Sequence, residues 1–373
     1  MRNMIANKMN FYGLVVIYLF LFNFQLITVA EVVSHLVETN VVCGEGMSFS
    51  NNAILYSVNS RGHAYAKVIN PDDLSDQYYI LQDQTGWNHL DFDMQPGGEG
   101  YMVFSGSNEV MFYRKVDSNF NVQSAQNMTH ESFHNWVPKV SGDNVIWWWS
   151  PGPYQHWDVK LENLATGTRT TLAGGPEYQY AWDIDGDYAL YSDDGTPYYK
   201  EIWSSNPAIA ITAEDGAQLA GEQTGGQINN NRILVYTSGR QSLYVYDIGT
   251  DTYARKVMES DSFDIIDPYL FGDMLVWSDD RNGSYDIYGL DLSVENSIPF
   301  RITDSDTTDE RMPLLYNNTI LWTQGPIGFN NSSPADLYVA TVPEPASLFL
   351  LALGGLALTR CKYSKMKNQF YKT

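Results

Sequence analysis

The chain has 373 residues, of which 44% are hydrophobic and 14% aromatic, and its formal net charge at pH 7 is −22. All 44 acidic residues lie within residues 31–345, where they meet only 15 Lys and Arg, so this body carries a net charge of −29. Such a charge repels nucleic acid and anionic membranes, which excludes nucleic-acid binding and leaves divalent cations and basic partners. Cys43 is the only cysteine of the body, so no internal disulfide can form there.

Residues 1–30 have the layout of a secretory signal peptide. Arg2 and Lys8 stand before and at the edge of a long apolar stretch, which ends on the small residue Ala30. We therefore predict export with removal of this segment. An uncleaved membrane anchor is the alternative, because the apolar stretch is long enough to span a bilayer.

Residues 32–38 read as a strand that belongs to no repeat. The last strand of the chain, 336–340, runs directly into Val342 and Pro343 and leaves no room for another. We predict that 32–38 supplies the missing outer strand of the last repeat, which would close a ring and remove exposed edges. A disordered leader is the alternative.

A β-hairpin unit recurs seven times between residues 31 and 341. Its clearest copy, 272–288, has a Gly-Asp turn, an apolar run that ends on an aromatic residue, a polar turn and an alternating return strand. The closing aromatic recurs at intervals of 41 to 48 residues, at Tyr56, Phe104, Trp147, Tyr191, Tyr236, Trp277 and Trp322. A period of this length, with several strands in each copy, predicts a β-propeller.

The expected architecture is therefore all-β, a single propeller domain of seven blades, with six or eight blades as alternatives. No long helical period or flexible linker divides the body. The repeats are expected near 40–84, 87–130, 132–174, 175–215, 216–261, 262–305 and 306–341.

Residues 130–134, His-Glu-Ser-Phe-His, match the zinc-protease signature H-E-x-x-H. That chemistry needs a helix, so that both histidines meet on one face. The repeat register instead places these residues in a connection between blades, and no third ligand is evident. The sequence therefore argues against zinc catalysis.

The third repeat is dense in aromatic residues. Either these side chains form a platform for stacking sugar rings, or they fill space between blades, which is the simpler interpretation. Alternation along a strand places Trp148 on the face opposite to two of its neighbours. The residues are Trp136, Trp147, Trp148, Trp149, Tyr154 and Trp157.

Asp183, Asp185 and Asp187 resemble the start of a calcium-binding loop and are the candidate metal ligands. The EF-hand continuation fails, because Asp194 stands where a glutamate is needed, and a solvated turn explains the pattern more simply. The Ser-Asp-Asp sequences at 192–194 and 278–280 are likewise interpreted as turns and not as acid–base pairs. No catalytic residue is predicted, and Ca²⁺ is the only cofactor considered.

The repeat resembles that of TolB-type propellers. The resemblance rests on residues 272–288, which contain Val-Trp-Ser-Asp-Asp-Arg-Asn-Gly and end in Asp-Ile-Tyr, and on residues 142–168. It implies the fold, and propellers of this type serve as interaction scaffolds and occasionally as lyases or hydrolases.

The C-terminal tail has three parts. Val342, Pro343, Glu344 and Pro345 stop the sheet, residues 346–358 are apolar, and five Lys and Arg follow without any acidic residue. This order predicts a membrane segment whose end stays cytoplasmic. Thirteen residues reach only about 20 Å as a helix, short of a hydrocarbon core of roughly 30 Å, so a permanent anchor is not favoured.

The tail at 342–367 resembles the PEP-CTERM sorting signal of bacterial surface proteins. The resemblance implies processing by an exosortase, a membrane-embedded transpeptidase, although the basic end is spread out and not a compact arginine cluster. We therefore expect an exported cell-surface or matrix protein whose propeller binds without catalysis. The alternative is a propeller lyase or glycoside hydrolase. Extracellular polysaccharide or a surface protein is the expected partner besides the exosortase, with membrane contact at least during sorting.

Overall fold

The computed structural model describes residues 34–41, 47–50, 53–58, 63–69, 76–79, 88–95, 98–105, 110–118, 121–129, 134–152, 155–219, 225–237, 242–329 and 333–342. These residues form 28 strands and no helix. All of them belong to one compact unit, Val33–Val342. The predicted signal peptide at 1–30, the residues 343–345 and the apolar segment at 346–358 lie outside the described residues. No helix among the described residues is long and apolar enough to cross a membrane.

The strands form five four-stranded antiparallel sheets and one eight-stranded sheet. The four-stranded sheets comprise β6 (Asn88–Met94), β7 (Gly100–Ser105), β8 (Met111–Val116) and β9 (Gln126–Asn127); β10 (His134–Ser141), β11 (Asn144–Ser150), β12 (Asp158–Asn163) and β13 (Thr168–Ala173); β14 (Gln179–Asp185), β15 (Tyr188–Asp193), β16 (Thr196–Glu201) and β17 (Ile209–Ala210); β18 (Gly226–Asn229), β19 (Arg232–Tyr236), β20 (Ser242–Asp247) and β21 (Arg255–Glu259); and β22 (Ile265–Phe271), β23 (Met274–Asp279), β24 (Asp286–Asp291) and β25 (Phe300–Arg301). The eight-stranded sheet comprises β1 (Ser34–Val41), β2 (Met47–Ser50), β3 (Ala53–Val58), β4 (His63–Ile69), β5 (Asp76–Tyr79), β26 (Thr308–Tyr316), β27 (Thr319–Pro326) and β28 (Ala335–Thr341).

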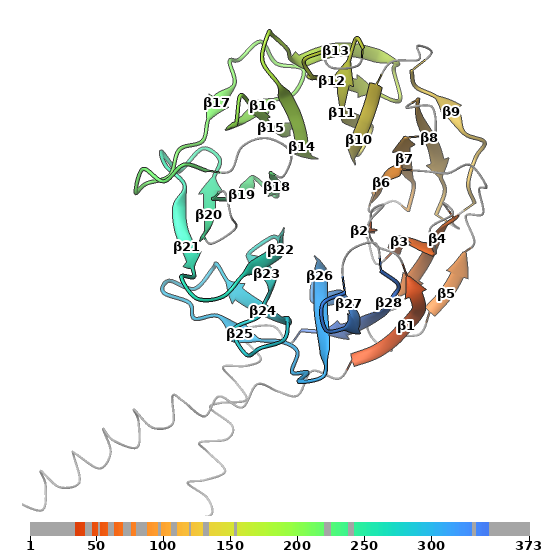
Figure 1. Ribbon diagram of the computed structural model, residues 1–373. Helices are drawn as coiled ribbons and strands as arrows, with labels where there is room; N and C mark the ends of the chain where they lie inside the picture. The colour runs from red at the N-terminus through yellow and green to blue at the C-terminus, as the bar shows by residue number, and fades with distance from the viewer. Residues whose placement is uncertain are drawn as a thin grey trace, which may run out of the picture. The chain divides into compact units, whose positions relative to one another are not determined.

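The sheets stand around a ring, with the first strand of each repeat innermost (Figure 1). If one continuous hydrogen-bonded sheet is counted as one blade, the propeller has six blades, an option that the sequence prediction left open beside its first choice of seven. The eight-stranded sheet holds two four-stranded units, β2 to β5 and β26 to β28 with β1. A single residue pair, Val41 with Val58, joins them. Each of the seven sequence repeats thus contributes one four-stranded unit.

The predicted closing strand is confirmed. β1 runs antiparallel to β28, from Ser34 beside Ala340 to Val41 beside Ala335, so the N-terminal end of the body completes the unit formed by the last repeat. Figure 1 shows these two strands side by side, although they lie at opposite ends of the unit's sequence. The sheet edge of β28 is thereby covered, as a closed ring requires.

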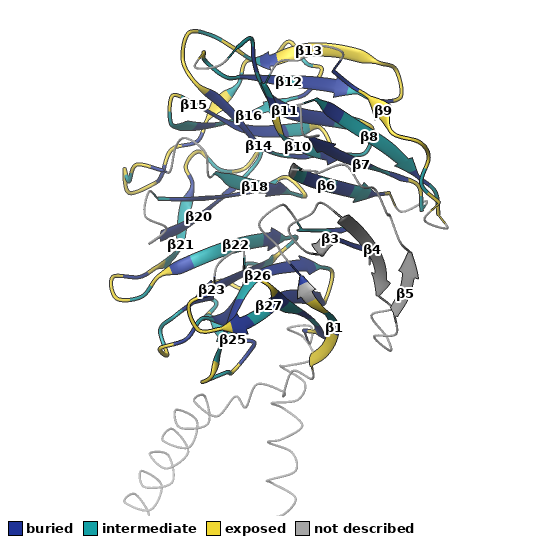
Figure 2. Ribbon diagram, turned by 45° about the vertical axis from the view of Figure 1, so that its right-hand side comes forward, coloured by how far each residue is buried: buried dark blue, intermediate teal, exposed yellow. Residues whose placement is uncertain are grey.

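The core lies between neighbouring sheets. All seven closing aromatics are buried, at exposed fractions of 9% or less, which confirms the repeat that the sequence predicted. Four of them stack on an aromatic side chain of the next strand, for example Trp277 on Tyr288 with ring centroids 6.2 Å apart. Figure 2 shows that exposure is concentrated on the outermost strands, such as β9 and β13.

The innermost strands share a feature that the sequence did not reveal. Five of them contain a register shift near their middle or start, the mark of a β-bulge. In four of these strands a non-glycine residue has a positive φ angle at the shift, at His89, Val137, Asp267 and Met312. A β-branched residue such as Val137 rarely adopts this conformation, so the surrounding ring must hold it there.

Candidate functional site

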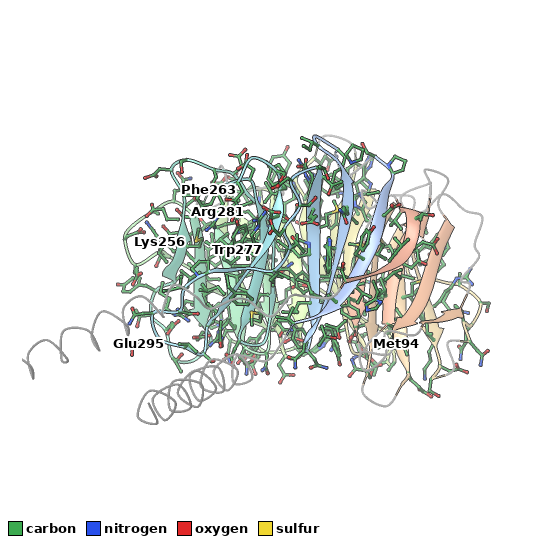
Figure 3. The ribbon with its side chains drawn as sticks, turned by 90° about the horizontal axis from the view of Figure 1, so that it is seen from below. Met94, Lys256, Phe263, Trp277, Arg281 and Glu295 are labelled. Atoms are coloured by element: carbon green, nitrogen blue, oxygen red, sulfur yellow. The ribbon has the colours of Figure 1, made fainter. Side chains whose placement is uncertain are left out.

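The ring has two faces, which differ in the ends of the innermost strands that they present. Figure 3 shows Phe263, just before β22, and Arg281 at one face, and Met94, the last residue of β6, at the opposite one. We call these the start face and the end face, because the innermost strands begin at the first and end at the second.

Asp183 and Asp185, two of the calcium candidates, connect β14 to the next blade. The Ile228 amide donates a hydrogen bond to Asp183 at 3.0 Å, and the Asn230 amide donates one to Asp185 at 2.6 Å. An innermost strand pairs with only one neighbour in its sheet, so its other edge has unpaired amide groups. These two carboxylates satisfy that need, which accounts for their alternate spacing.

The same connection recurs around the ring. Polar side chains at equivalent positions of other innermost strands accept hydrogen bonds from the amides of the following innermost strand. The pairs are Asp91 with Val140, Asp93 with Gly142, Gln227 with Leu270 and Asn229 with Gly272. These side chains therefore serve first to link each blade to the next.

Asp187, the third calcium candidate, is exposed in the turn after β14 and does not share these contacts. Within the described ranges, no group of three or more His, Cys, Asp or Glu side chains is placed to hold a metal ion. The zinc-type sequence lies mostly outside the described residues. Its last residue, His134, begins strand β10 and is not helical. Calcium binding at 183–187 stays a prediction.

Four ionisable side chains of the innermost strands interact electrostatically, and we call them the axial cluster: Asp91, Lys139, Asp183 and Tyr269. Lys139 Nζ lies 3.9 Å from Asp91 Oδ1 on the neighbouring innermost strand, and its positive charge also acts on Asp183. Tyr269 comes from β22, and burial together with the charges of Asp183 and Asp91 raises its pKa. The four residues come from four innermost strands, β6, β10, β14 and β22.

Within the axial cluster, burial raises the pKa of Asp183 to about 7, while Lys139 opposes the shift and the negative charge of Asp91 adds to it. Burial also raises the pKa of Asp91, against the attraction of Lys139. The attraction of Asp91 in turn raises the pKa of Lys139. One lysine thus serves two carboxylates. A carboxyl group with a pKa near 7 exchanges its proton at neutral pH, which suits acid–base chemistry or a pH-dependent contact.

A second group of residues lies where the innermost strands of three successive blades begin, and we call it the aromatic surface: His89, His134, Trp136, Trp157 and Tyr178. The rings of Trp136 and Trp157 are 5.6 Å apart and tilted by 34°. His134 lies 6.4 Å from the first ring and 6.1 Å from the second, and His89 lies 6.2 Å from Trp136. Trp136 is 37% exposed and Tyr178 is 45% exposed.

The tryptophans that drew attention in the sequence divide between packing and surface. Trp147 and Trp148 are buried in two different clusters between blades, which confirms the packing interpretation for them. Trp149 is half-buried beneath the amino group of Lys160, which lies 4.0 Å from the ring centre. The exposed ring is that of Trp136, whose position on the surface no sequence pattern indicated. Tyr154 lies outside the described residues.

The Ser-Asp-Asp turn at 278–280 differs from the prediction. Asp279 does form the turn, since it accepts a hydrogen bond from the Arg281 amide, but it is fully buried and not solvated. Its oxygens also accept hydrogen bonds from the Trp277 indole at 2.8 Å and the Arg281 guanidinium. The prediction of a solvated turn is therefore wrong for Asp279, because a nearby arginine and an indole N–H compensate its burial.

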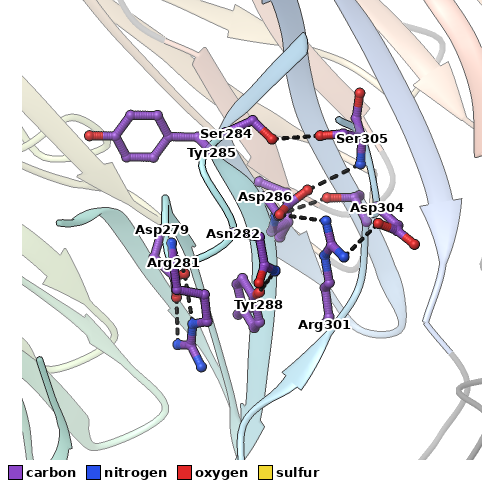
Figure 4. Close-up of polar contacts among 12 residues, drawn as sticks. Asp279, Arg281, Asn282, Ser284, Tyr285, Asp286, Tyr288, Arg301, Asp304 and Ser305 are labelled. Atoms are coloured by element: carbon purple, nitrogen blue, oxygen red, sulfur yellow. Dashed lines mark hydrogen bonds and ion pairs between the residues drawn. The ribbon is translucent and has the colours of Figure 1, made fainter. Parts of the chain in front are cut away.

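Arg301 organises the neighbouring corner of the same sheet. It donates to the fully buried Asp286 at 2.7 Å and also pairs with the exposed Asp304 (Figure 4). Asp286 further accepts a hydrogen bond from the Ser305 amide. The part of the start face formed by β22 to β25 is thus occupied by ion pairs in which each charge has a partner of opposite sign.

Comparisons with known proteins place the two parts of the chain. Residues 341–362 match the PEP-CTERM protein-sorting motif. A signal of this kind implies an exported protein that an exosortase sorts to the cell surface. A comparison with curated proteins finds no significant match.

Several solved structures are similar to the body. The chain resembles a prolyl endopeptidase (TM-score 0.55, 11% identity), covering 83% of this chain and 51% of that one. It also resembles the β-propeller domain of the Trilobed protease from Pyrococcus furiosus (TM-score 0.53, 8% identity; 82% and 94% covered) and an acylaminoacyl peptidase (TM-score 0.50, 13% identity; 78% and 51% covered). The chain thus spans about half the length of the two peptidases. At these identities the likeness shows the propeller fold alone.

Proposed function

We propose that this protein is exported through residues 1–30 and sorted to the cell surface through residues 342–367. There its propeller acts as a non-catalytic binding scaffold for a surface polymer or another surface protein. The exosortase processes the tail, and the apolar segment at 346–358 holds the protein at the membrane until that step.

The observation that carries the proposal is the position of the sorting motif. The matched residues begin at Thr341, the last residue of β28. Val342 is still part of the folded body, because it is buried and its amide donates a hydrogen bond to the Asn318 carbonyl at 2.7 Å. The propeller is therefore complete where the Pro-Glu-Pro sequence starts, and processing there leaves the ring intact.

The charges of the tail support a halt during export. Each of its five cations costs roughly 2.5–3.5 kcal/mol at the centre of a membrane helix, so they favour the cytoplasmic side. The acidic body is then outside and the motif lies at the outer interface. Thirteen apolar residues hold this arrangement only loosely, which suits an intermediate that awaits processing.

The test is made in cells that contain an exosortase. Replacing Pro343, Glu344 and Pro345 together by alanine should leave an unprocessed, membrane-associated form of higher mass. Deleting 342–373 should release the propeller into the medium. Asn368→Ala, beyond the matched motif, is the control and should be processed like the wild type. If mass spectrometry finds Lys372 still attached to wild-type protein at the surface, the processing step is contradicted.

A second candidate is an enzyme that acts on extracellular polysaccharide. The specific observation in its favour is the axial cluster, where Asp183 has a pKa of about 7 beside Lys139. An enzyme should release oligosaccharides from a polysaccharide that it binds, and Asp183→Asn should abolish that release. Binding without any product would favour the scaffold.

A further inference from the structure

Four rings of the aromatic surface form a connected group, and Tyr178 is linked to them through the buried rings of Tyr180 and Trp148. Trp136 and Trp157 contact each other and the ring of His134, whereas Trp203, which is 44% exposed, donates its indole hydrogen bond to Asn144 outside this group. Single exposed aromatics are normal on a protein surface, but a contiguous group marks a binding site.

Buried rings support the aromatic surface from below. Trp157 rests on Trp148 at 6.3 Å, and Trp148 rests on Tyr180 at 4.9 Å. Trp148 is fixed in turn by a hydrogen bond of 2.6 Å from its indole to the Ala181 carbonyl, and Tyr180 stacks on Tyr178 with an angle of 9° between the rings. The exposed rings therefore stand on an ordered layer of side chains and need little rearrangement to bind a ligand.

The backbone also directs Trp136 outward. The bulge of β10 follows immediately, where Val137 has a φ angle of 50° and the pairing with β11 shifts. Asn135, on the other side of Trp136, is buried and accepts a hydrogen bond from the Trp147 indole at 3.0 Å. Trp136 thus lies between a buried polar residue and a strained bulge, and both fix the course of the backbone at this position.

Charge restricts the ligand. The body carries 15 basic and 44 acidic residues, a net charge of −29, and Glu177 stands exposed beside Tyr178. Burial lowers the pKa of His89, and Lys139 lowers it further, so this imidazole is uncharged at neutral pH. Polyanions are therefore repelled from the body as a whole, and no histidine charge at this position compensates for it.

We propose that the aromatic surface binds a neutral polysaccharide, with sugar rings stacked on Trp136 and Trp157 and a further contact at Tyr178. The inference rests on the proposed scaffold function and names its ligand class. Flat, apolar ring faces match the C–H face of a pyranose, while the uncharged imidazole of His89 supplies hydrogen bonds to hydroxyl groups. The three blades from β6 to β17 together form the site, so a chain of several sugars is needed to cover it.

The experiment uses the exported protein purified from the cell surface, so a failure of binding is separate from a failure of sorting. Binding is measured by calorimetry with cellohexaose, laminarihexaose, mannohexaose and chitohexaose as neutral probes, and with oligogalacturonate and oligoalginate as anionic ones. We expect at least one neutral probe to bind, with the anionic probes at least tenfold weaker. Trp136→Ala should weaken binding at least tenfold, Tyr178→Ala about threefold, and Trp136→Phe less than threefold.

Trp203→Ala and Tyr253→Ala are the matched controls, because both side chains are exposed outside the aromatic surface, and their affinities should equal that of the wild type. Circular dichroism and melting curves confirm that each variant is folded. The proposal is overturned if no neutral probe binds, if only the anionic probes bind, if folded Trp136→Ala binds like the wild type, or if Trp203→Ala loses as much affinity.

Discussion

The sheets β10 to β13 and β22 to β25 are two copies of one unit, and they use the start face in opposite ways. Trp147 and Trp277 occupy equivalent positions and are both buried. Two residues further along, one copy has Trp149, half-buried under the amino group of Lys160, and the other has the fully buried Asp279. The same backbone therefore accepts an aromatic ring or a compensated charge.

The consequence of that difference is visible at the surface. In the copy with Asp279, Arg281 pairs with the carboxylate and stacks on Tyr288 at 4.0 Å and on Phe263 at 4.5 Å. The charges and rings of this corner are thus occupied by contacts with one another. In the other copy, Trp136 is 37% exposed and contacts the half-buried Trp157. Different blades of one repeated scaffold thus carry the buried ion pairs and the exposed aromatic rings.

The largest effect on stability is expected from removing the strand that closes the ring, because both copies depend on that ring. Deleting residues 34–41 removes β1, exposes the edge of β28 and uncouples the two halves of the eight-stranded sheet. We expect loss of the cooperative melting transition and aggregation, measured by calorimetry and size-exclusion chromatography. Leu36→Ser, at an exposed position of the same strand, is the control and should melt like the wild type. A monomeric deletion variant with an unchanged melting curve would refute closure by β1.

The next largest effect is expected from breaking the ion pairs in the sheet β22 to β25. Asp286→Ala should cost about 3–5 kcal/mol of the free energy of unfolding, because it removes the fully buried carboxylate and leaves the half-buried Arg301 guanidinium without its main partner. Asp304→Ala removes the other carboxylate of the same arginine, but that carboxylate is 76% exposed, so about 0–1 kcal/mol is expected. Urea denaturation measures both. Equal losses would show that burial does not decide the strength of these pairs.

An effect of intermediate size is expected on the pH dependence of the free energy of unfolding. The folded protein raises the pKa of Asp183 to about 7, so the native state holds this proton more tightly than the unfolded chain does. Stability from this group is therefore present in acid and falls as the pH rises from about 4 to 7, by at most about 4 kcal/mol. Asp183→Asn keeps an oxygen for the Ile228 amide and should flatten that slope.

Asp187→Asn, in the exposed turn, is the matched control for the pH series and should leave the slope as it is. The measurement is the free energy of unfolding between pH 4 and 8 for all three proteins. A slope that survives in Asp183→Asn would contradict the assignment of this proton to the axial cluster.

The smallest effect on stability is expected in the sheet β10 to β13, which contributes Trp136 to the aromatic surface. Trp136→Ala should cost about 1–2 kcal/mol of the free energy of unfolding, because 37% of the residue is exposed and only its contacts with neighbouring rings are lost. Trp277→Ala, at a fully buried aromatic position, should cost about 3–5 kcal/mol. A large loss for Trp136→Ala would mean that the aromatic surface serves stability and not binding.

The repeat and its closure could be predicted, because both depend on spacing along the chain. The closing aromatics mark one fixed position in each unit, and the missing strand after 336–340 pointed to a partner at the N-terminal end. The role of Asp183 and Asp185 could not be predicted, since their alternate spacing fits a calcium loop as well as a link between blades. Their partners lie on the next blade, about one repeat away.

The aromatic surface and the axial cluster depend on distances that no linear spacing contains. The charge of Asp91 acts on Tyr269 only because β6 and β22 are innermost strands of the same ring. His89 meets Trp136 only because neighbouring blades start at the same face, and the bulge that turns Trp136 outward has no consistent residue type, with His, Val, Asp and Met at the shifted positions. Buried charge compensation, as at Asp279, also needs the partner's position in space.

The most direct test of the central claim is the shift of the melting temperature on adding a neutral hexasaccharide. A ligand at a hundred times its dissociation constant stabilises the folded state by about 2.7 kcal/mol, so wild type and Trp203→Ala should show the same upward shift. Trp136→Ala should melt within a few degrees of the wild type without ligand and show little shift with it. An equal shift in Trp136→Ala, or none in the wild type with any neutral probe, would contradict the division of the ring into a stabilising side and a binding side.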